Sequence, residues 1–209
     1  MKVLKNIGVG FLVSFIGSIP LGYLNVIGFE IYTKSNLWQL IYYLLGVLII
    51  EAIVIYATFY FANKLNMNPK LKKWISIFSI GFLIFLTFYF YPTEGQNSIN
   101  NTQESRFIGF PTFIIGLILS SLNFAQVPFW LSWNLYLVNK NYISTKKKLG
   151  FYYVVGTLIG TFFGMLALIL GLKSITKNGV VSENIILNNI WVVFLALTVF
   201  QIIQLLRKK

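Results

Sequence analysis

Six long apolar segments set the limits on what this chain can fold into. They cover residues 6–32, 37–62, 74–91, 107–137, 149–172 and 185–206. A helix that spans a bilayer needs roughly 20 apolar residues in succession. The chain has 209 residues, so these segments leave no room for a sizeable soluble domain. The sequence therefore predicts an all-α polytopic membrane protein with six transmembrane helices.

The distribution of charge predicts how these helices are oriented. The net charge is +12, a balance that is also found in nucleic-acid-binding proteins. Here, however, the basic residues lie in short clusters beside the apolar segments, and 13 of the 17 fall at the two termini and in the two loops that share their side. Because Lys and Arg favour the cytoplasmic side of a membrane, we expect a multi-pass protein of the cytoplasmic (inner) membrane with both termini in the cytoplasm. Its partner is then the lipid bilayer, with no nucleic acid.

The residue types that are missing exclude several kinds of chemistry. The chain has no Cys, His or Asp, so it has no disulfide, no Cys or His metal ligand and no Ser-His-Asp triad. We expect no cofactor, no metal and no enzymatic activity. A cleaved signal peptide is an alternative for the N-terminus, but the apolar run is too long and no cleavage motif follows.

Two of the six segments are interrupted near the expected middle of the bilayer. Pro20 and Gly22 interrupt the first, and Asn123 and Pro128 interrupt the fourth. Proline removes a backbone donor and disturbs the preceding turn. The freed backbone groups are tolerated at that depth only where they face protein or a watery cavity. Broken helices 1 and 4 are therefore predicted, and such breaks are typical of the binding sites of secondary transporters.

An internal similarity predicts two repeats. Residues 42–49 (YYLLGVLI) resemble residues 152–159 (YYVVGTLI), and each octamer follows a segment interrupted by proline. Three spans per repeat would invert the second copy, so we predict two inverted three-helix repeats at 1–91 and 107–209, joined by an extracytoplasmic polar loop at 92–106. Chance similarity between apolar sequences is the alternative. This alignment pairs Glu51 with Thr161.

Glu51 is an acidic residue within a long apolar segment, where an acid is unexpected. It lies near the middle of segment 37–62, where a charged group costs a few kcal/mol on insertion scales. Such an acid can take up and release a proton or bind a cationic group. The alternative is a neutral acid that donates one hydrogen bond to a nearby carbonyl.

Three amides lie at or beside the breaks, namely Asn25, Asn123 and Gln126. Amides offer donors and acceptors to a solute, so with Pro20, Gly22 and Pro128 they form the predicted substrate site. The alternative is hydrogen bonding between helices, which is the role we expect for Asn134. Glu30 is expected to be a solvated carboxylate near the outer end of its segment, or else part of an outer gate.

Gly156, Gly160 and Gly164 recur at every fourth position. This spacing lets another helix approach closely, either within the protomer or across a homodimer.

The motifs together resemble the LysE superfamily, the LysE/RhtB-type exporters of amino acids. The residues that carry the resemblance are Ile19-Pro20-Leu21-Gly22-Tyr23-Leu24-Asn25, the acid Glu51, and Ser121-Leu122-Asn123. The resemblance implies proton-coupled export of amino acids or related small solutes, and some members of the superfamily are thought to export cations. The chain departs from the family where Phe124 replaces the usual proline after Asn123, and where a second acid is missing.

Two hypotheses follow. The first is a secondary transporter that binds its solute between the two breaks and a proton on Glu51. The second is a membrane scaffold or assembly factor without transport, for which a midplane acid and two breaks have no evident use.

Overall fold

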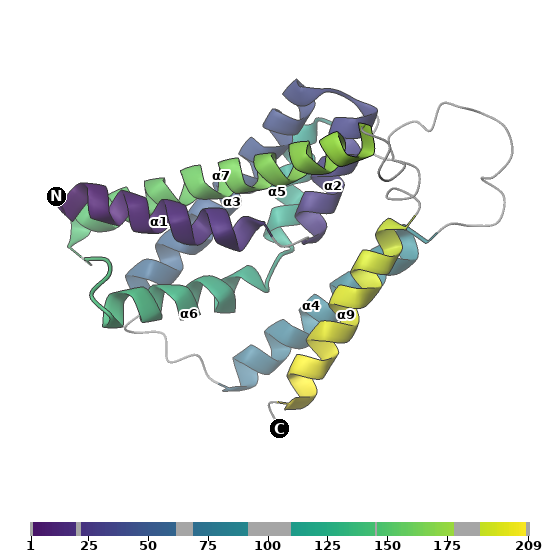
Figure 1. The fold of residues 1–209 in the computed structure, drawn as a ribbon. Helices are drawn as coiled ribbons and strands as arrows, with labels where there is room; N and C mark the ends of the chain where they lie inside the picture. Colours follow the sequence, from purple (N-terminus) through teal and green to yellow (C-terminus); the bar gives the residue numbers. More distant parts are fainter. Residues whose placement is uncertain are drawn as a thin grey trace, which may run out of the picture.

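The computed structural model describes residues 2–19, 22–61, 69–91, 110–144, 146–177 and 189–207. Within these ranges the chain forms eight α-helices and no strand (Figure 1). The all-α prediction is therefore confirmed for the described residues. Pro20 and the predicted loop at 92–106 lie outside them. The helices are α1 (Lys2–Ser18), α2 (Tyr23–Lys34), α3 (Leu37–Phe61), α4 (Pro69–Tyr89), α5 (Thr112–Ser121), α6 (Gln126–Asn139), α7 (Lys147–Lys177) and α9 (Ile190–Arg207).

Each predicted segment coincides with one helix or one bent pair of helices. α3 and α7 are each long and apolar enough to cross a bilayer. The pairs α1–α2 and α5–α6 reach that length together, and the apolar stretches of α4 and α9, Ser76–Tyr89 and Trp191–Ile203, are shorter. The described residues thus contain two candidate spans, or four if each bent pair is one span. This is consistent with a membrane protein, as are the large apolar side chains exposed along the outer faces of the helices.

Helix α1 lies along α7 with very close backbone contact (Figure 1). A Cβ atom added to Gly156 would overlap the carbonyl oxygen of Ile7, and one added to Gly160 would overlap that of Phe11. Residue numbers increase in the same direction along both helices, so α1 and α7 are parallel. The contact is also close at a glycine of α1, because a Cβ atom added to Gly10 would overlap the carbonyl oxygen of Tyr153 in α7. The predicted small-residue stripe therefore packs two helices within one chain.

Helices α3 and α5 make an equivalent contact. A Cβ atom added to Gly46 would overlap the carbonyl oxygen of Phe113, and one added to Gly116 would overlap that of Tyr43. The Thr112 hydroxyl donates to Gln39 Oε1 at 2.8 Å, while Ser120 donates to the Val47 carbonyl at 3.3 Å. These two helices are therefore also parallel, with one glycine from each helix at the crossing.

The second half of each bent pair contacts the same long helix as the first half. α2 contacts α7, and α6 contacts α3, while α3 and α7 also touch each other. α2 is the most enclosed helix, because eight of its 12 residues are buried. It passes through the largest apolar cluster, which includes Ile27, Phe29 and Ile169. α2 is therefore a core element with no large lipid-facing side.

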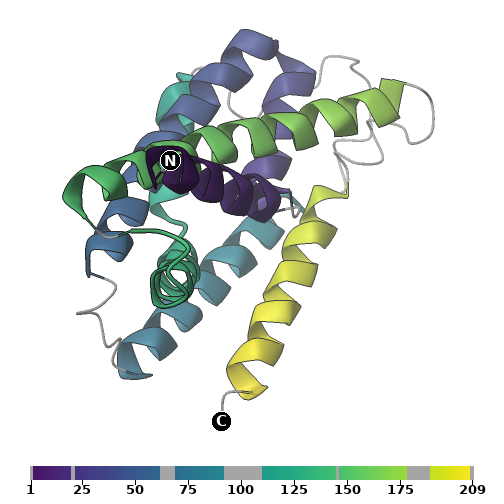
Figure 2. The same ribbon diagram turned by 60° about the vertical axis from the view of Figure 1, so that its left-hand side comes forward.

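Helices α4 and α9 pack chiefly against each other, on one side of the remaining helices (Figures 1 and 2). Two edge-to-face aromatic pairs join the residues just after α4 to α9, Phe90 with Phe194 and Tyr91 with Trp191. Residue numbers increase in opposite directions along the two helices, so α4 and α9 are antiparallel. They touch the other helices beside the breaks, where Phe82 meets Tyr23 and Phe78 meets Phe124.

Candidate functional site

The helix of the fourth predicted segment is broken between Ser121 and Gln126. The axes of α5 and α6 differ by 71°. Pro128 lies in the first turn of α6, where a backbone N–H has no partner within the helix, so proline is tolerated. The Gln126 side-chain amide donates to the carbonyl oxygen of Ser120, near the end of α5, at 3.0 Å, and the backbone N–H of Asn123 donates to the same oxygen at 3.1 Å. The predicted break is confirmed, and the Gln126 side chain links its two sides.

The first predicted segment is divided in a similar way. The axes of α1 and α2 differ by 76°. Gly22 is the N-cap of α2, and no side chain caps that helix start. The Asn25 amide donates to the carbonyl oxygen of Ser18, the last residue of α1, at 2.9 Å. In both bent pairs, therefore, an amide in the second helix bonds to the end of the first.

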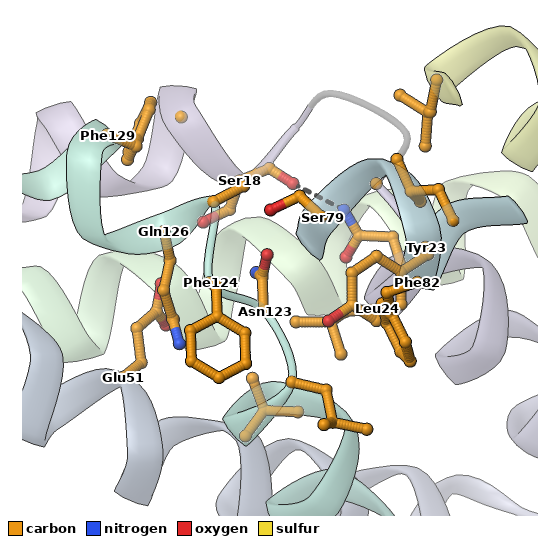
Figure 3. Close-up of a pocket in the computed structure, with 18 of the residues that line it drawn as sticks. Ser18, Tyr23, Leu24, Glu51, Ser79, Phe82, Asn123, Phe124, Gln126 and Phe129 are labelled. Atoms are coloured by element: carbon orange, nitrogen blue, oxygen red, sulfur yellow. Dashed lines mark hydrogen bonds between the residues drawn. The ribbon is translucent and has the colours of Figure 1, made fainter. Parts of the chain in front are cut away.

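A cavity of about 300 Å³ lies where the two breaks meet. Five predicted site residues line it, and they come from four different parts of the fold: Gly22, Asn25, Glu51, Asn123 and Gln126 (Figure 3). A cavity of this size suits a small solute. Pro128 does not line the cavity, and its place at the start of α6 gives it a structural role.

Glu51 extends from α3 into this cavity. The Thr161 hydroxyl and the Trp130 indole N–H lie within hydrogen-bonding reach of its carboxyl group. Thr161 also shares a 2.5 Å hydrogen bond with Ser14 of α1. Glu51 Oε2 is buried and has no hydrogen-bond partner among the described residues. Among the described residues that line the cavity there is no Lys or Arg, so none of them supplies a basic side chain to balance an ionised Glu51.

Glu30 is placed differently from its expected position. Its side chain is only 2% exposed, and Lys34 Nζ lies 3.1 Å from Oε1. The expectation of a solvated interfacial carboxylate was therefore wrong, because α2 is enclosed by other helices. The ion pair joins successive turns of one helix, and Glu30 does not line the cavity.

Asn134 joins three helices, as its position within an apolar segment indicated. It is fully buried, its amide donates to Thr58 Oγ1 at 3.0 Å, and Tyr153 donates to Asn134 Oδ1 at 2.7 Å. These bonds connect α6 with α3 and α7. The side chain does not line the cavity.

We expect Asn134→Leu to lower stability without changing solute preference. Hydrogen bonds between membrane helices contribute about 0.6 kcal/mol each and at most about 1.7 kcal/mol, so losing two should cost about 1–2 kcal/mol. Thermal unfolding of the purified variant measures this cost. Equal stability of the wild type and Asn134→Leu would contradict this role.

Several cavity residues were not predicted from the sequence, namely Ser79, Trp130, Thr161 and Gln201. Ser79 and Gln201 are among the few polar residues within the apolar stretches of α4 and α9, which is the signal that could have found them. Trp130 looks like any other aromatic residue of an apolar helix. Only the packing of α6 on α3 brings it to Glu51.

Comparison with family models, curated proteins and solved structures finds no match to this chain. In the part of the chain that the structure describes, no three His, Cys, Asp or Glu side chains gather to hold a metal ion.

Proposed function

We propose that this protein is a secondary transporter that exports amino acids or related small solutes across the cytoplasmic membrane, coupled to protons. The observation that carries the proposal is the single cavity shared by both helix breaks and Glu51. Broken helices present backbone groups to a solute at the middle of the membrane. A protonatable acid in the same cavity can couple the solute to the proton gradient.

The proposal includes six spans arranged as two inverted repeats. The pairing of Gly46 with Phe113 on α3–α5 corresponds to that of Gly156 with Ile7 on α7–α1. In both cases the parallel partner is the first half of a bent pair. Gly46 and Gly156 occupy the same position in the two similar octamers, and both lie at a close crossing with the first half of a bent pair. Similarity of sequence and similarity of packing thus both support the repeat.

The position of Glu51 fits the same symmetry. Its predicted equivalent, Thr161, lies within hydrogen-bonding reach of it. Equivalent residues of two repeats meet only where the pseudo-two-fold axis passes between them. The axis would then run through the cavity, where a solute can be approached alternately from either side as the repeats rearrange.

The lining favours a solute without net negative charge. An anionic solute would lie beside Glu51, and the described lining residues include no basic side chain to balance it. A zwitterion can place its ammonium group towards Glu51 and its carboxylate towards the N-terminal end of α2 or α6, which carries a partial positive charge. A simple organic cation, as in a cation exporter, would make only the contact with Glu51.

A scaffold or assembly factor without transport is the second candidate function. The proposal is tested by solute uptake into inverted membrane vesicles, with amino acids and small cations supplied singly under an imposed proton gradient. Uptake of at least one solute, above that of vesicles from cells lacking the protein, supports transport. Uptake equal to those vesicles for the whole panel, with the protein present in the membrane, favours the scaffold.

A further inference from the structure

One wall of the cavity comes from helices that no sequence motif singled out. Ser79, Phe82 and Leu83 of α4 line it, together with Leu197 and Gln201 of α9. Ser79 and Leu83 are four residues apart, as are Leu197 and Gln201, so each helix presents one continuous face to the cavity. Figure 3 shows Ser79 among the lining residues.

Two buried oxygen atoms on this wall, Ser79 Oγ and Gln201 Oε1, have no hydrogen-bond partner among the described residues. Ser79 is 6% exposed, and its Oγ is buried and unbonded. Gln201 Oε1 is likewise buried and unbonded. Buried polar groups in proteins are almost always hydrogen-bonded, so each exception needs a reason.

Neighbouring hydroxyl groups on the same helices behave in the ordinary way. Thr87 of α4 donates to the Leu83 carbonyl at 2.8 Å, and Thr198 of α9 donates to the Phe194 carbonyl at 2.8 Å. Neither threonine lines the cavity. A helix can therefore satisfy a hydroxyl group on its own backbone. On α4 and α9 the buried oxygen atoms without a partner are those of Ser79 and Gln201, which line the cavity.

We propose that α4 and α9 complete the solute site, with Ser79 and Gln201 as specificity-determining residues that bind the polar groups of the solute. This inference rests on the transport function proposed above. A hydroxyl group and an amide can each donate and accept, so they can bind a neutral polar group of an amino-acid-like solute. They lie on α4 and α9, whereas Glu51 lies on α3 and the two breaks lie in the bent pairs α1–α2 and α5–α6.

The natural absence of cysteine allows a direct test. Ser79→Cys and Gln201→Cys introduce single thiols on the wall, while Thr87→Cys and Thr198→Cys are matched controls on the same helices. In membranes treated with a small, positively charged methanethiosulfonate reagent, the two wall thiols should react roughly tenfold faster or more, because only a hydrated thiol ionises to the reactive thiolate. At least one solute from a panel of amino acids and small amines should slow the reaction of Ser79→Cys.

Equal reaction rates for wall and control thiols would overturn the inference, as would a lack of protection by every solute in the panel. If a solute protects Ser79→Cys but the wild type transports nothing, the proposed transport function fails, while solute binding at this wall stands. If the wild type transports a solute that gives no protection, transport stands and the inference about this wall fails.

A second pair of variants guards against misfolding of the cysteine variants. Ser79→Ala should keep the melting temperature of the wild type, because its hydroxyl group has no partner to lose. It should nevertheless raise the half-saturation concentration for the transported solute severalfold. Thr87→Val should leave that concentration unchanged. A lower melting temperature with unchanged half-saturation in Ser79→Ala would make the residue structural and overturn the inference.

Discussion

Glu51→Gln should abolish proton-driven transport while leaving the protein folded. The amide has nearly the same shape as the carboxyl group and can still bond to Thr161 and Trp130, but it cannot take up or release a proton. A charged residue at the bilayer centre costs about 2.5–3.5 kcal/mol on insertion scales, so the substitution should not lower stability. Uptake under an imposed pH gradient, measured in proteoliposomes, should fall to the level of protein-free liposomes.

Solute exchange without a gradient separates coupling from binding. If Glu51 carries only the proton, Glu51→Gln should still exchange labelled for unlabelled solute across the membrane. Glu30→Gln is the matched control, because Glu30 is also a buried acid but pairs with Lys34 outside the cavity. It should retain proton-driven uptake. Full gradient-driven uptake by Glu51→Gln would contradict the coupling role and favour a scaffold.

The second large effect, a loss of stability, is expected where Gly156 brings α7 close to α1 and where Gly46 brings α3 close to α5. We call these two places the glycine crossings. Gly156→Ala and Gly46→Ala should each destabilise the protein, because the added methyl group meets the backbone of Ile7 or of Phe113, which cannot turn aside as a side chain can. Overpacking typically costs about 1–3 kcal/mol and occasionally more. Thermal unfolding of the purified variants measures the loss. If the two crossings are equivalent, as the repeats require, the two losses should be similar.

Gly81→Ala and Gly171→Ala are the controls for this prediction. A Cβ atom at either position meets nothing within 4 Å. Replacing glycine with alanine inside a helix usually stabilises it by about 0.5–1 kcal/mol, so these variants should be as stable as the wild type or slightly more stable. A stable Gly156→Ala together with an unstable Gly46→Ala would contradict the equivalence of the crossings.

The sequence predicted the helices and the second break because their signals are local. Long apolar runs, the proline within α6 and the amides beside the break act through the backbone of their own segment. Glu51 was found because an acid in an apolar run is costly wherever the run packs. The octamer similarity aligns Gly46 with Gly156, and each of these glycines lies where the backbone of another helix comes very close.

The pairing of helices could not be predicted in the same way. Lipid and protein interior are both apolar, so a membrane helix has no polar stripe that marks its outer face. Nothing in the sequence therefore indicated that α1 would lie along α7, or that α2 would be enclosed and bury Glu30. The wall formed by Ser79 and Gln201 depends on this packing, and so it became visible only in the structure.

The most direct test of the account is proton movement driven by a solute. Purified protein would be reconstituted into liposomes that enclose a pH-sensitive dye, and amino acids and small cations would be added singly without any imposed gradient. We predict that at least one solute moves protons in the direction opposite to its own in the wild type, and that the same solute moves none in Glu51→Gln. Solute entry without proton movement in the wild type, or the same proton movement in Glu51→Gln, would contradict the claim that this cavity couples the two.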